Sequence, residues 1–357
     1  MRILPGSRYT GIDAPLARGS PRGASPPSSY HRRVTDISVA WATSVWFSTH
    51  ARDLPWRRKG TSPWAVLVSE IMLQQTPVSR VEPAWREWCA RWPTPTELAN
   101  EPAGEAIRAW GRLGYPRRAL RLHTCAVTIV ERHAGEVPKS LPDLLALPGV
   151  GTYTARAVAA FAFQQRHPVV DTNVRRVVAR AVDGRPEAGP ATTVADLTAV
   201  EALLPEDPVA AAVASAAIME LGALVCTART PKCQNCPLRT ICAWQLGGTA
   251  HSRVDSGSRS DSGSRSNGKS GSNGAQHDVS APRARRSQRY HGTDRYVRGL
   301  LLSVLRETVE PVPACRLDTV WPEHEQRGRA LGGLVADGLV CEVTAGHYAL
   351  PGCGTDC

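Results

Sequence analysis

Four of the chain's ten cysteines lie within seventeen residues of one another, in the order Cys226, Cys233, Cys236 and Cys242. Four thiolates at these spacings can surround a tetrahedral zinc ion or a [4Fe–4S] cluster. Structural zinc sites commonly use two CxxC pairs held well apart, whereas this segment has one CxxC between longer spacers. The pattern favours iron–sulfur slightly and leaves zinc open. It is also typical of a protein in a reducing compartment.

The segment before and around these cysteines has a helical pattern of apolar residues. Between about residues 36 and 246, apolar residues recur every three or four positions, and no stretch alternates over five or more residues. Turn signals such as Trp92-Pro-Thr-Pro95 and Pro148-Gly-Val-Gly151 separate the repeats. We therefore predict an all-α domain of about ten helices over residues 36–246.

Charge and composition divide the rest of the chain. The net charge is +11, but residues 1–34 and 247–290 each carry a net +5, so the remainder is nearly neutral. Residues 1–35 predict a disordered basic extension, and 247–290 a flexible Gly/Ser/Arg linker. A basic chain suggests a nucleic-acid partner, but here that argument needs local patches. No run reaches the roughly 18 uncharged apolar residues of a membrane helix, so we expect no membrane partner.

The last ordered segment is short. Helical periodicity over 296–306, 316–321 and 323–337 is followed by a hairpin pattern over 339–350. We predict a small winged-helix-like module over residues 291–352.

The sequence Leu147-Pro-Gly-Val-Gly-Thr-Tyr-Thr-Ala155 offers a site for a phosphate. Gly149, Gly151 and Thr152 would expose backbone N–H groups at the start of a helix, where the helix dipole favours an anion. Such a turn can bind DNA without reading its sequence. The alternative is an ordinary corner between two helices.

Two carboxylates are candidates for acid–base chemistry. Glu70 lies within the apolar helix pattern, and a buried carboxylate there would have a raised pKa suited to a general acid. Asp171 precedes a predicted helix, whose N-terminus would hold it ionised and able to stabilise a cation. The plainer interpretations are a surface glutamate and a helix cap. Whether the two residues meet is left open.

Taken together, these features resemble the helix–hairpin–helix DNA glycosylases that carry an iron–sulfur cluster. The resemblance covers about residues 36–246 and rests on motifs in the family's order: Leu54-Pro-Trp-Arg57, Ser69-Glu-Ile-Met-Leu-Gln-Gln-Thr76, Leu113-Gly-Tyr115, Leu147-Pro-Gly-Val-Gly151, Val170-Asp-Thr-Asn173, Met219-Glu-Leu-Gly222 and the four cysteines. It implies a two-lobed all-α core with a [4Fe–4S] loop over residues 226–242.

Within that family, the chain looks most similar to MutY-type adenine glycosylases, which remove adenine mispaired with 8-oxoguanine or guanine. Endonuclease III-type relatives have a lysine nucleophile where this chain has Tyr153, and a tyrosine cannot form a Schiff base. The resemblance implies a monofunctional enzyme of base excision repair that flips adenine out of double-stranded DNA. The alternatives are an endonuclease III-type pyrimidine-lesion glycosylase/lyase and a non-catalytic iron–sulfur DNA-binding sensor.

The resemblance also implies a role for each matching residue. Glu70 would protonate the adenine, Asp171 would stabilise the sugar cation, and Tyr153 and Asn173 would support them. The residues at positions that contact the adenine are Trp56, Arg57 and Glu220, and those that wedge into the base stack are Gln75 and Tyr115.

The chain departs from well-known members at its C-terminal end. Those members carry a NUDIX-like domain that reads 8-oxoguanine, whereas ordered sequence here runs only from about 294 to 352. We expect a monomer located in the cytoplasm or nucleoid. A clamp or mismatch-repair partner cannot be read from the sequence.

Overall fold

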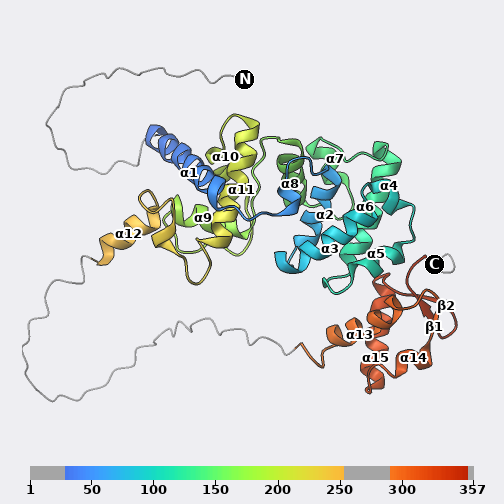
Figure 1. Cartoon of the computed structure of the whole chain (residues 1–357). Coiled ribbons are helices and arrows are strands. Elements are labelled where there is room, and N and C mark those ends of the chain that lie inside the picture. Colours follow the sequence, from blue (N-terminus) through green and yellow to red (C-terminus); the bar gives the residue numbers. More distant parts are fainter. Residues whose placement is uncertain (1–28, 253–289, 353–357) are drawn as a thin grey trace, which may run out of the picture.

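The computed structural model describes residues 29–252 and 290–352, with side chains described over 39–247 and 290–352. It confirms the predicted all-α core with its two lobes, which lie side by side in Figure 1. The cysteine lobe contains α1 (Ser29–His50), α9 (Thr172–Ala181), α10 (Val194–Leu203), α11 (Pro208–Leu224), η2 (Cys233–Asn235) and α12 (Ala243–Ser252). The central lobe contains η1 (Pro55–Arg57), α2 (Pro63–Leu73), α3 (Val78–Arg91), α4 (Pro95–Ala99), α5 (Ala103–Trp110), α6 (Arg117–His133), α7 (Leu141–Ala146) and α8 (Thr152–Phe163).

Each lobe has its own apolar core. In the central lobe Trp88 packs edge-on against Trp92 and Trp110, with ring centroids 4.7 and 5.7 Å apart. In the cysteine lobe, valines of α9 pack against Ile218 and Leu221 of α11. The chain crosses between the lobes twice, after α1 and between α8 and α9. Side chains near these crossings can therefore approach one another from both lobes.

The structure differs from the expected helix boundaries at three places. Helix α1 begins at Ser29, so the boundary expected at residue 35 lies inside it. The turn signal around Pro95 starts α4 instead, because Thr94 and Glu97 form a capping box and proline suits the first helical position. Helix α12 extends to Ser252, into the segment expected as linker. The remaining parts of the two segments expected to be disordered, residues 1–28 and 253–289, lie outside the described residues.

The C-terminal module consists of α13 (Asp294–Arg306), β1 (Val312–Pro313), α14 (Ala314–Asp318), α15 (His324–Ala336), β2 (Cys341–Thr344) and β3 (His347–Ala349). Its strands form one antiparallel sheet in the order β1-β3-β2. The predicted three helices and hairpin are present. Strand β1 was not predicted, since two residues are too few for an alternating pattern.

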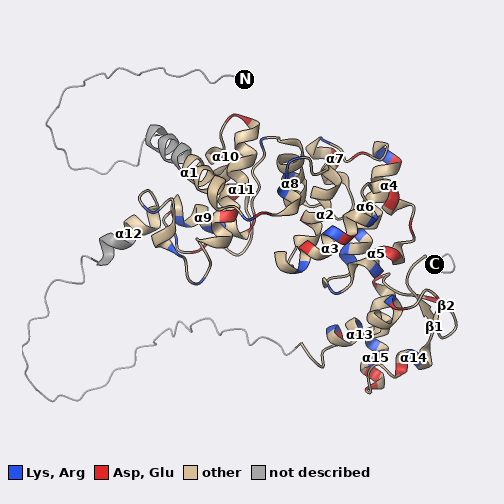
Figure 2. Ribbon diagram, in the orientation of Figure 1, with Lys and Arg blue, Asp and Glu red and all other residues tan. Residues whose placement is uncertain are grey.

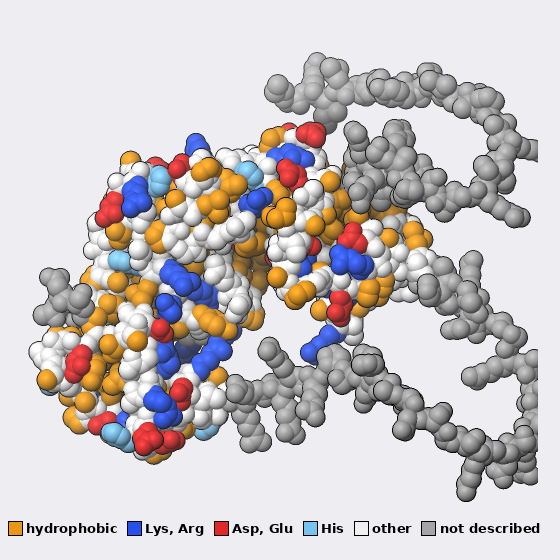
Figure 3. All heavy atoms as spheres, turned by 180° about the vertical axis from the view of Figure 1, so that it is seen from behind, with side chains coloured by type: hydrophobic (Ala, Val, Ile, Leu, Met, Phe, Trp, Pro, Cys, Tyr) orange, Lys and Arg blue, Asp and Glu red, His pale blue; other side chains and the backbone are white. Residues whose placement is uncertain are grey.

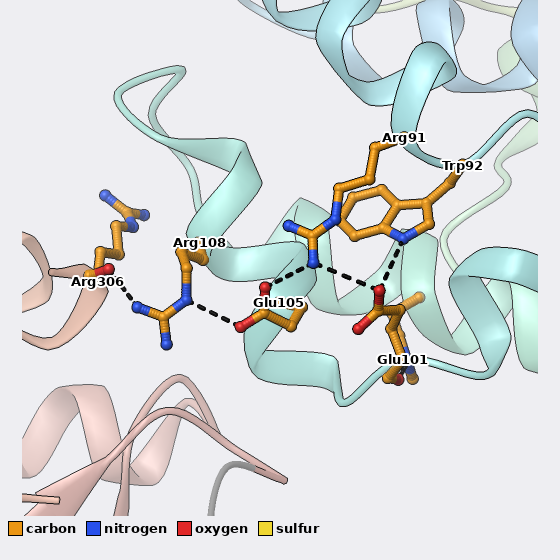
Figure 4. Close-up of polar contacts among 7 residues, drawn as sticks. Arg91, Trp92, Glu101, Glu105, Arg108 and Arg306 are labelled. Atoms are coloured by element: carbon orange, nitrogen blue, oxygen red, sulfur yellow. Dashed lines mark hydrogen bonds and ion pairs between the residues drawn. The ribbon is translucent and has the colours of Figure 1, made fainter. Parts of the chain in front are cut away.

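The module is fixed to helix α5 of the central lobe. Leu301 and Leu305 of α13 belong to the same apolar core as the central lobe. Arg306 donates from Nε to the carbonyl oxygen of Ile107 at 3.0 Å, and Arg108 donates back to the carbonyl oxygen of Arg306. Figure 4 shows this contact continuing through Glu105, whose carboxylate accepts from Arg108 and Arg91. The module thus has a defined position on the core.

In the described part of the chain, no single helix is long and apolar enough to cross a membrane. Helices α10 and α11 reach that level of apolarity only as a pair, and they are bent by 119° relative to each other.

Candidate active site

Glu70 lies on the buried side of helix α2. Ser62 caps this helix and Pro63 occupies its first position, and the residues from Trp64 to Met72 that follow are all buried. Only 7% of Glu70 is exposed, which rules out a surface glutamate. The pKa of Glu70 is raised to about 7, mainly by burial and to a smaller extent by the negative charge of Asp171. Glu70 therefore retains a proton near neutral pH.

The first turn of helix α8 brings Tyr153 to Glu70. The Tyr153 hydroxyl donates a hydrogen bond to the Glu70 carboxylate, which partly offsets the rise in the pKa of Glu70. Burial and the two neighbouring carboxylates raise the pKa of Tyr153 well above its usual value. Tyr153 thus remains a neutral hydrogen-bond donor.

Asp171 is the N-cap of helix α9. Its carboxylate accepts from the backbone N–H of Val174 at 2.7 Å and from Nδ2 of Asn173 at 2.8 Å. We expected the helix N-terminus to keep Asp171 ionised. Both hydrogen bonds do lower its pKa, but burial outweighs them and the net pKa is raised. Asp171 is a helix cap and also lies close enough to Glu70 to affect its pKa.

Arg176 connects this carboxylate to the cysteine loop. It donates to Oδ1 of Asn173 and to the carbonyl oxygens of Gly222 and Cys226, each at 2.7 Å. Its role was not predicted, because a basic residue one turn into an amphipathic helix looks like an ordinary surface residue.

Glu220 lies at the other side of the site, with no exposed side-chain surface. Arg52 donates to it from its backbone N, from Nε and from Nη2 at 3.0, 2.7 and 2.8 Å, and Arg57 donates at 2.9 Å. Although burial opposes ionisation, these arginines lower the pKa of Glu220 to about 2. Glu220 is therefore a buried, ionised carboxylate. Arg52 was missed, since nothing local distinguishes it from its neighbour Arg58, which pairs with exposed Asp53.

Trp56 and Arg57 belong to the same 3-10 turn but have different surroundings. Trp56 is buried edge-on against Trp85, with ring centroids 5.7 Å apart. Arg57 is 24% exposed, and its positive charge lowers the pKa of Glu70. Arg57 therefore links the Glu220 carboxylate to the Glu70 carboxyl.

Gln75 and Tyr115 are exposed, and both adopt positive φ angles, 56° and 47°. This backbone conformation is uncommon for residues other than glycine and occurs often at functional sites. Arg118 ties the two loops together, because it donates to the carbonyl oxygen of Gln74 at 2.7 Å and to that of Gly114 at 3.1 Å.

The turn before helix α8 exposes backbone as predicted. Gly149 has φ +79°, and a Cβ placed there would lie 2.9 Å from Cβ of Arg121, so only glycine fits. Gly151 is the N-cap of α8, and Thr152 follows it in an exposed position. This turn can accept a phosphate at the helix N-terminus.

The four cysteines belong to the cysteine lobe. Burial raises the pKa of Cys236, and its proximity to the other three thiols contributes to the rise. In the described residues, however, no three His, Cys, Asp or Glu side chains are grouped to hold a single metal ion. Four thiols near one another suit a cluster of several irons, in which each iron is bound by one thiolate.

Arg180 holds the backbone of this loop. It donates to the carbonyl oxygens of Thr227 and Ala228 at 2.7 and 3.0 Å, and to Sγ of Cys226 at 3.5 Å. A hydrogen bond to a cysteine sulfur is a common feature of iron–sulfur sites. Arg229 and Lys232 of the same loop are exposed.

Basic residues are spread over both lobes and the module in Figure 2, with acidic residues interspersed. On helix α6, Arg117 and Arg121 are exposed, whereas Arg118 is buried.

Comparisons with known proteins agree with this geometry. Residues 68–198 match the HhH-GPD superfamily of base excision DNA repair proteins, and residues 226–242 match the iron–sulfur binding domain of endonuclease III.

Two bacterial relatives match over most of the chain. The adenine DNA glycosylase of Mycolicibacterium smegmatis is 52% identical over 87% of this chain and 94% of its own length. The adenine DNA glycosylase of Mycobacterium tuberculosis is 50% identical over 90% of this chain and 95% of its own length. The human adenine DNA glycosylase is 38% identical over 65% of this chain and 44% of its own length.

Solved structures show a similar fold. A thermostable thymine-DNA glycosylase aligns with a TM-score of 0.55 at 25% identity over 62% of this chain and all of its own. A trapped endonuclease III–DNA covalent intermediate aligns with a TM-score of 0.52 at 20% identity over 61% of this chain and 98% of its own.

Proposed function

This chain belongs to the adenine DNA glycosylase family, and on that premise we propose that it hydrolyses the N-glycosidic bond of adenine mispaired with 8-oxoguanine or guanine in double-stranded DNA. The observation that carries the proposal is the buried Glu70 carboxyl, with a pKa of about 7, beside Tyr153 and Asp171. Adenine is a poor leaving group until a ring nitrogen is protonated. A carboxyl that holds a proton at neutral pH in a site closed to water can supply that proton.

The first step is protonation of the flipped adenine. Glu70 donates its proton to N7 of the adenine, and the Tyr153 hydroxyl stabilises the carboxylate that remains. Arg57 lies near enough to stabilise the same charge. The protonated adenine then leaves with the electron pair of the glycosidic bond.

The second step is stabilisation of the sugar. Bond cleavage leaves an oxocarbenium-like cation at the deoxyribose, as in other glycoside hydrolyses. Asp171 faces this charge, because Asn173 and the backbone of α9 fix its carboxylate. A positive charge nearby lowers the pKa of Asp171, so the cation itself favours the ionised form. Water then adds to the sugar, with the Glu70 carboxylate as base.

Tyr153 also determines what the enzyme does not do. A lyase reaction at the abasic product needs an amine that forms a Schiff base with the sugar. Tyr153 is instead a neutral donor to Glu70, as its raised pKa indicates. The proposed enzyme therefore releases the base and leaves the strand intact.

DNA is held by contacts that do not read sequence. The exposed turn of Gly149, Gly151 and Thr152 binds a phosphate, and Gln75 and Tyr115 enter the base stack where the adenine has left. Cys226, Cys233, Cys236 and Cys242 would hold a [4Fe–4S] cluster, which would support the loop rather than supply chemistry at the base. Arg229 and Lys232 of this loop are exposed and can reach phosphates.

Single-turnover base release tests the proposal. Four duplexes would be compared: adenine opposite 8-oxoguanine, guanine or thymine, and thymine glycol opposite adenine. We expect release only from the first two, strand breaks only after alkali treatment, and loss of release in Glu70→Gln and Asp171→Asn. DNA binding without release from any duplex would instead support a non-catalytic sensor, and alkali-independent breaks at thymine glycol would support a lyase.

A further inference from the structure

The loops that carry Gln75 and Tyr115 share an unusual backbone conformation. One loop, residues 74–77, joins α2 to α3, and the other, residues 111–116, joins α5 to α6. Gln75 has φ 56° and Tyr115 has φ 47°, although neither is a glycine. A residue in the left-handed region is held there by its surroundings, because the conformation itself costs free energy. Each loop therefore needs a fixed anchor.

Arg118, in the first turn of α6, is the anchor of both loops. Its Nη1 donates to the carbonyl oxygen of Gln74 at 2.7 Å, and its Nη2 donates to that of Gly114 at 3.1 Å. Each carbonyl belongs to the residue directly before a left-handed one. Because the peptide unit is planar, a change in φ of Gln75 or Tyr115 would swing the preceding carbonyl out of its hydrogen bond. One guanidinium group thus holds both φ angles.

The guanidinium group is fixed on the Gln75 side by three further acceptors. It donates at 2.9 Å to the carbonyl oxygens of Ile71 and Met72 and to Oγ1 of Thr76. Ile71 and Met72 lie in the last turn of α2, where carbonyl oxygens lack a donor from the helix itself. Arg118 therefore closes the end of α2 as well as the loop that follows it.

Aromatic rings fix the guanidinium group on the Tyr115 side. Its central carbon lies 5.1 Å from the centroid of the Trp110 ring and 5.6 Å from that of the Tyr115 ring. Trp110 also donates from Nε1 to the carbonyl oxygen of Gly114 at 3.0 Å. A planar guanidinium group stacks on rings and donates in several fixed directions, unlike the single nitrogen of a lysine. The tie between the two loops therefore requires arginine.

Arg118 acts through the loops and not through direct contact with DNA. Figure 3 shows Lys and Arg side chains exposed on the back of the molecule. Arg118 differs from such residues because only 6% of it is exposed. A phosphate contact needs a donor that solvent can reach, whereas the hydrogen bonds of this guanidinium group are directed to Gln74, Thr76 and Gly114.

We propose that Arg118 is a positioning residue that couples the two loops, so that Gln75 and Tyr115 enter the base stack together when the adenine is flipped out. This inference rests on the proposed function, which assigns both side chains to the stack. A displacement of one loop shifts the guanidinium group and, through it, the other loop. Coupling therefore makes flipping a single step in which both side chains fill the gap.

Three variants separate coupling from other effects. Arg118→Lys keeps the positive charge, but its single nitrogen cannot span the carbonyls of both loops. Thr76→Val is milder, because it removes one acceptor and leaves Arg118 in place. Arg295→Ala is the matched control. The guanidinium carbon of Arg295 lies 4.6 Å from the Tyr115 ring centroid, but Arg295 has no hydrogen bond to either loop in the described part of the chain.

The first test follows flipping by stopped-flow fluorescence. The duplex carries 2-aminopurine next to an adenine opposite 8-oxoguanine, and its fluorescence rises when the adjacent base leaves the stack. All variants are made in the Glu70→Gln background, so that adenine release does not contribute. We expect flipping to slow about tenfold in Arg118→Lys, about threefold in Thr76→Val and less than about twofold in Arg295→Ala. Equal slowing in Arg118→Lys and Arg295→Ala, or none in Arg118→Lys, would overturn the proposal.

The second test measures coupling in the free protein. A fluorotyrosine incorporated in place of Tyr115 reports the environment of this ring by fluorine NMR. We expect Thr76→Val, a change in the other loop, to shift the resonance and to cause no further shift in the Arg118→Lys background. Thr128→Val is the control and should cause no shift, because the Thr128 hydroxyl donates to the carbonyl oxygen of Thr124 within α6. An unchanged resonance in Thr76→Val, or a shift that persists in the Arg118→Lys background, would refute the coupling.

The third test excludes a general loosening of α2, the helix that carries Glu70. If Arg118→Lys merely exposed Glu70, the pKa of this carboxyl would fall from about 7 toward its ordinary value, and the pH midpoint of adenine release would fall with it. We expect Arg118→Lys to release adenine more slowly with an unchanged midpoint. A lower midpoint would contradict the positioning role.

The proposed function and this inference fail separately. A wild-type protein that neither flips nor releases adenine would contradict the proposed function, whereas the fluorine spectra test the tie between the loops without DNA.

Discussion

Asn173 and Cys226 are held by one guanidinium group, since Arg176 donates to the side-chain oxygen of the first and the carbonyl oxygen of the second, each at 2.7 Å. Asn173 in turn donates to the Asp171 carboxylate at 2.8 Å. The cysteine loop and the Asp171 carboxylate are therefore parts of one hydrogen-bonded unit. In the proposed mechanism, the cysteine loop would contribute by fixing geometry rather than by touching the base.

Arg176→Ala should slow adenine release at least tenfold with little change in DNA affinity, because Asn173 loses the donor that orients it. Single-turnover rates and abasic-duplex affinities would be measured together. Arg175→Ala is the control: Arg175 belongs to the same helix and is more buried than Arg176, but it bonds to Gly189 and Asp196, away from the site. Equal rate losses in the two variants would mean that α9 is merely destabilised.

Gly222→Ala should damage the same unit by crowding. A Cβ at Gly222 would lie 2.7 Å from Cβ and 2.8 Å from the backbone oxygen of Asn173, so α9 and α11 must separate. We expect a loss of about 1–3 kcal/mol in the free energy of unfolding, together with slower release. Gly328→Ala, in α15 with nothing within 4 Å of its Cβ, should be neutral or slightly stabilising. Denaturant unfolding of both variants measures the difference.

Adenine release should decline as the pH rises through about 7, because Glu70 must carry a proton to act as the acid.

The free energy of unfolding should also decline as the pH rises through about 7. The folded protein binds the proton more tightly than the unfolded chain, so the contribution of Glu70 is complete below pH 4.5 and is lost as the pH rises through 7. The difference corresponds to roughly 3 kcal/mol at about 1.4 kcal/mol per pKa unit. Glu70→Gln should remove this dependence from melting curves recorded between pH 4.5 and 8.

Tyr153→Phe should move the alkaline limit of activity to higher pH. The hydroxyl of Tyr153 stabilises the ionised form of Glu70, so its loss raises the pKa of Glu70 further. The pH profile of single-turnover release measures this shift in whatever activity remains. A shift toward lower pH would show that the hydroxyl does not donate to Glu70.

Arg52→Ala should destabilise the fold by about 2–5 kcal/mol, since it leaves the buried Glu220 carboxylate with fewer donors. The low pKa of Glu220, about 2, stabilises the protein above pH 4.5, and this contribution is lost as the pH falls toward 2. Arg52→Ala should therefore unfold at a higher pH than the wild type during acid titration. Arg58→Ala removes only the exposed pair with Asp53 and should leave the stability nearly unchanged.

The sequence predicted the helices of the core because their apolar faces repeat over many residues. It failed where local signals were short or ambiguous. The two residues of β1 carry no periodicity, and the Pro95 turn signal proved to be the first turn of α4. The strand partner of β1 cannot be read from two residues, whereas the Thr94 and Glu97 spacing of the capping box was present in the sequence.

Glu70 and Asp171 could be proposed from their residue types and local patterns, but their proximity depends on how the two lobes meet. Arg52 and Arg176 could not be found in this way, because their importance comes from partners 168 and 50 residues distant. The net rise in the pKa of Asp171 was also missed, since burial by the opposite lobe outweighs the local helix cap.

Arg118 is buried, yet its partners are backbone carbonyls and a hydroxyl rather than a carboxylate. It donates to the carbonyl oxygens of Ile71, Met72, Gln74 and Gly114 and to Oγ1 of Thr76. Burial lowers its pKa only to about 10, so it remains charged at neutral pH. Carbonyl oxygens at the end of α2 carry partial negative charges and accept hydrogen bonds from its Nη1 without cancelling its full positive charge. Beneath the loops of Gln75 and Tyr115, the protein thus holds a permanent positive charge that attracts an approaching polyanion. Because this charge does not belong to a surface ion pair, counter-ions in solution cannot displace it by competing for such a pair.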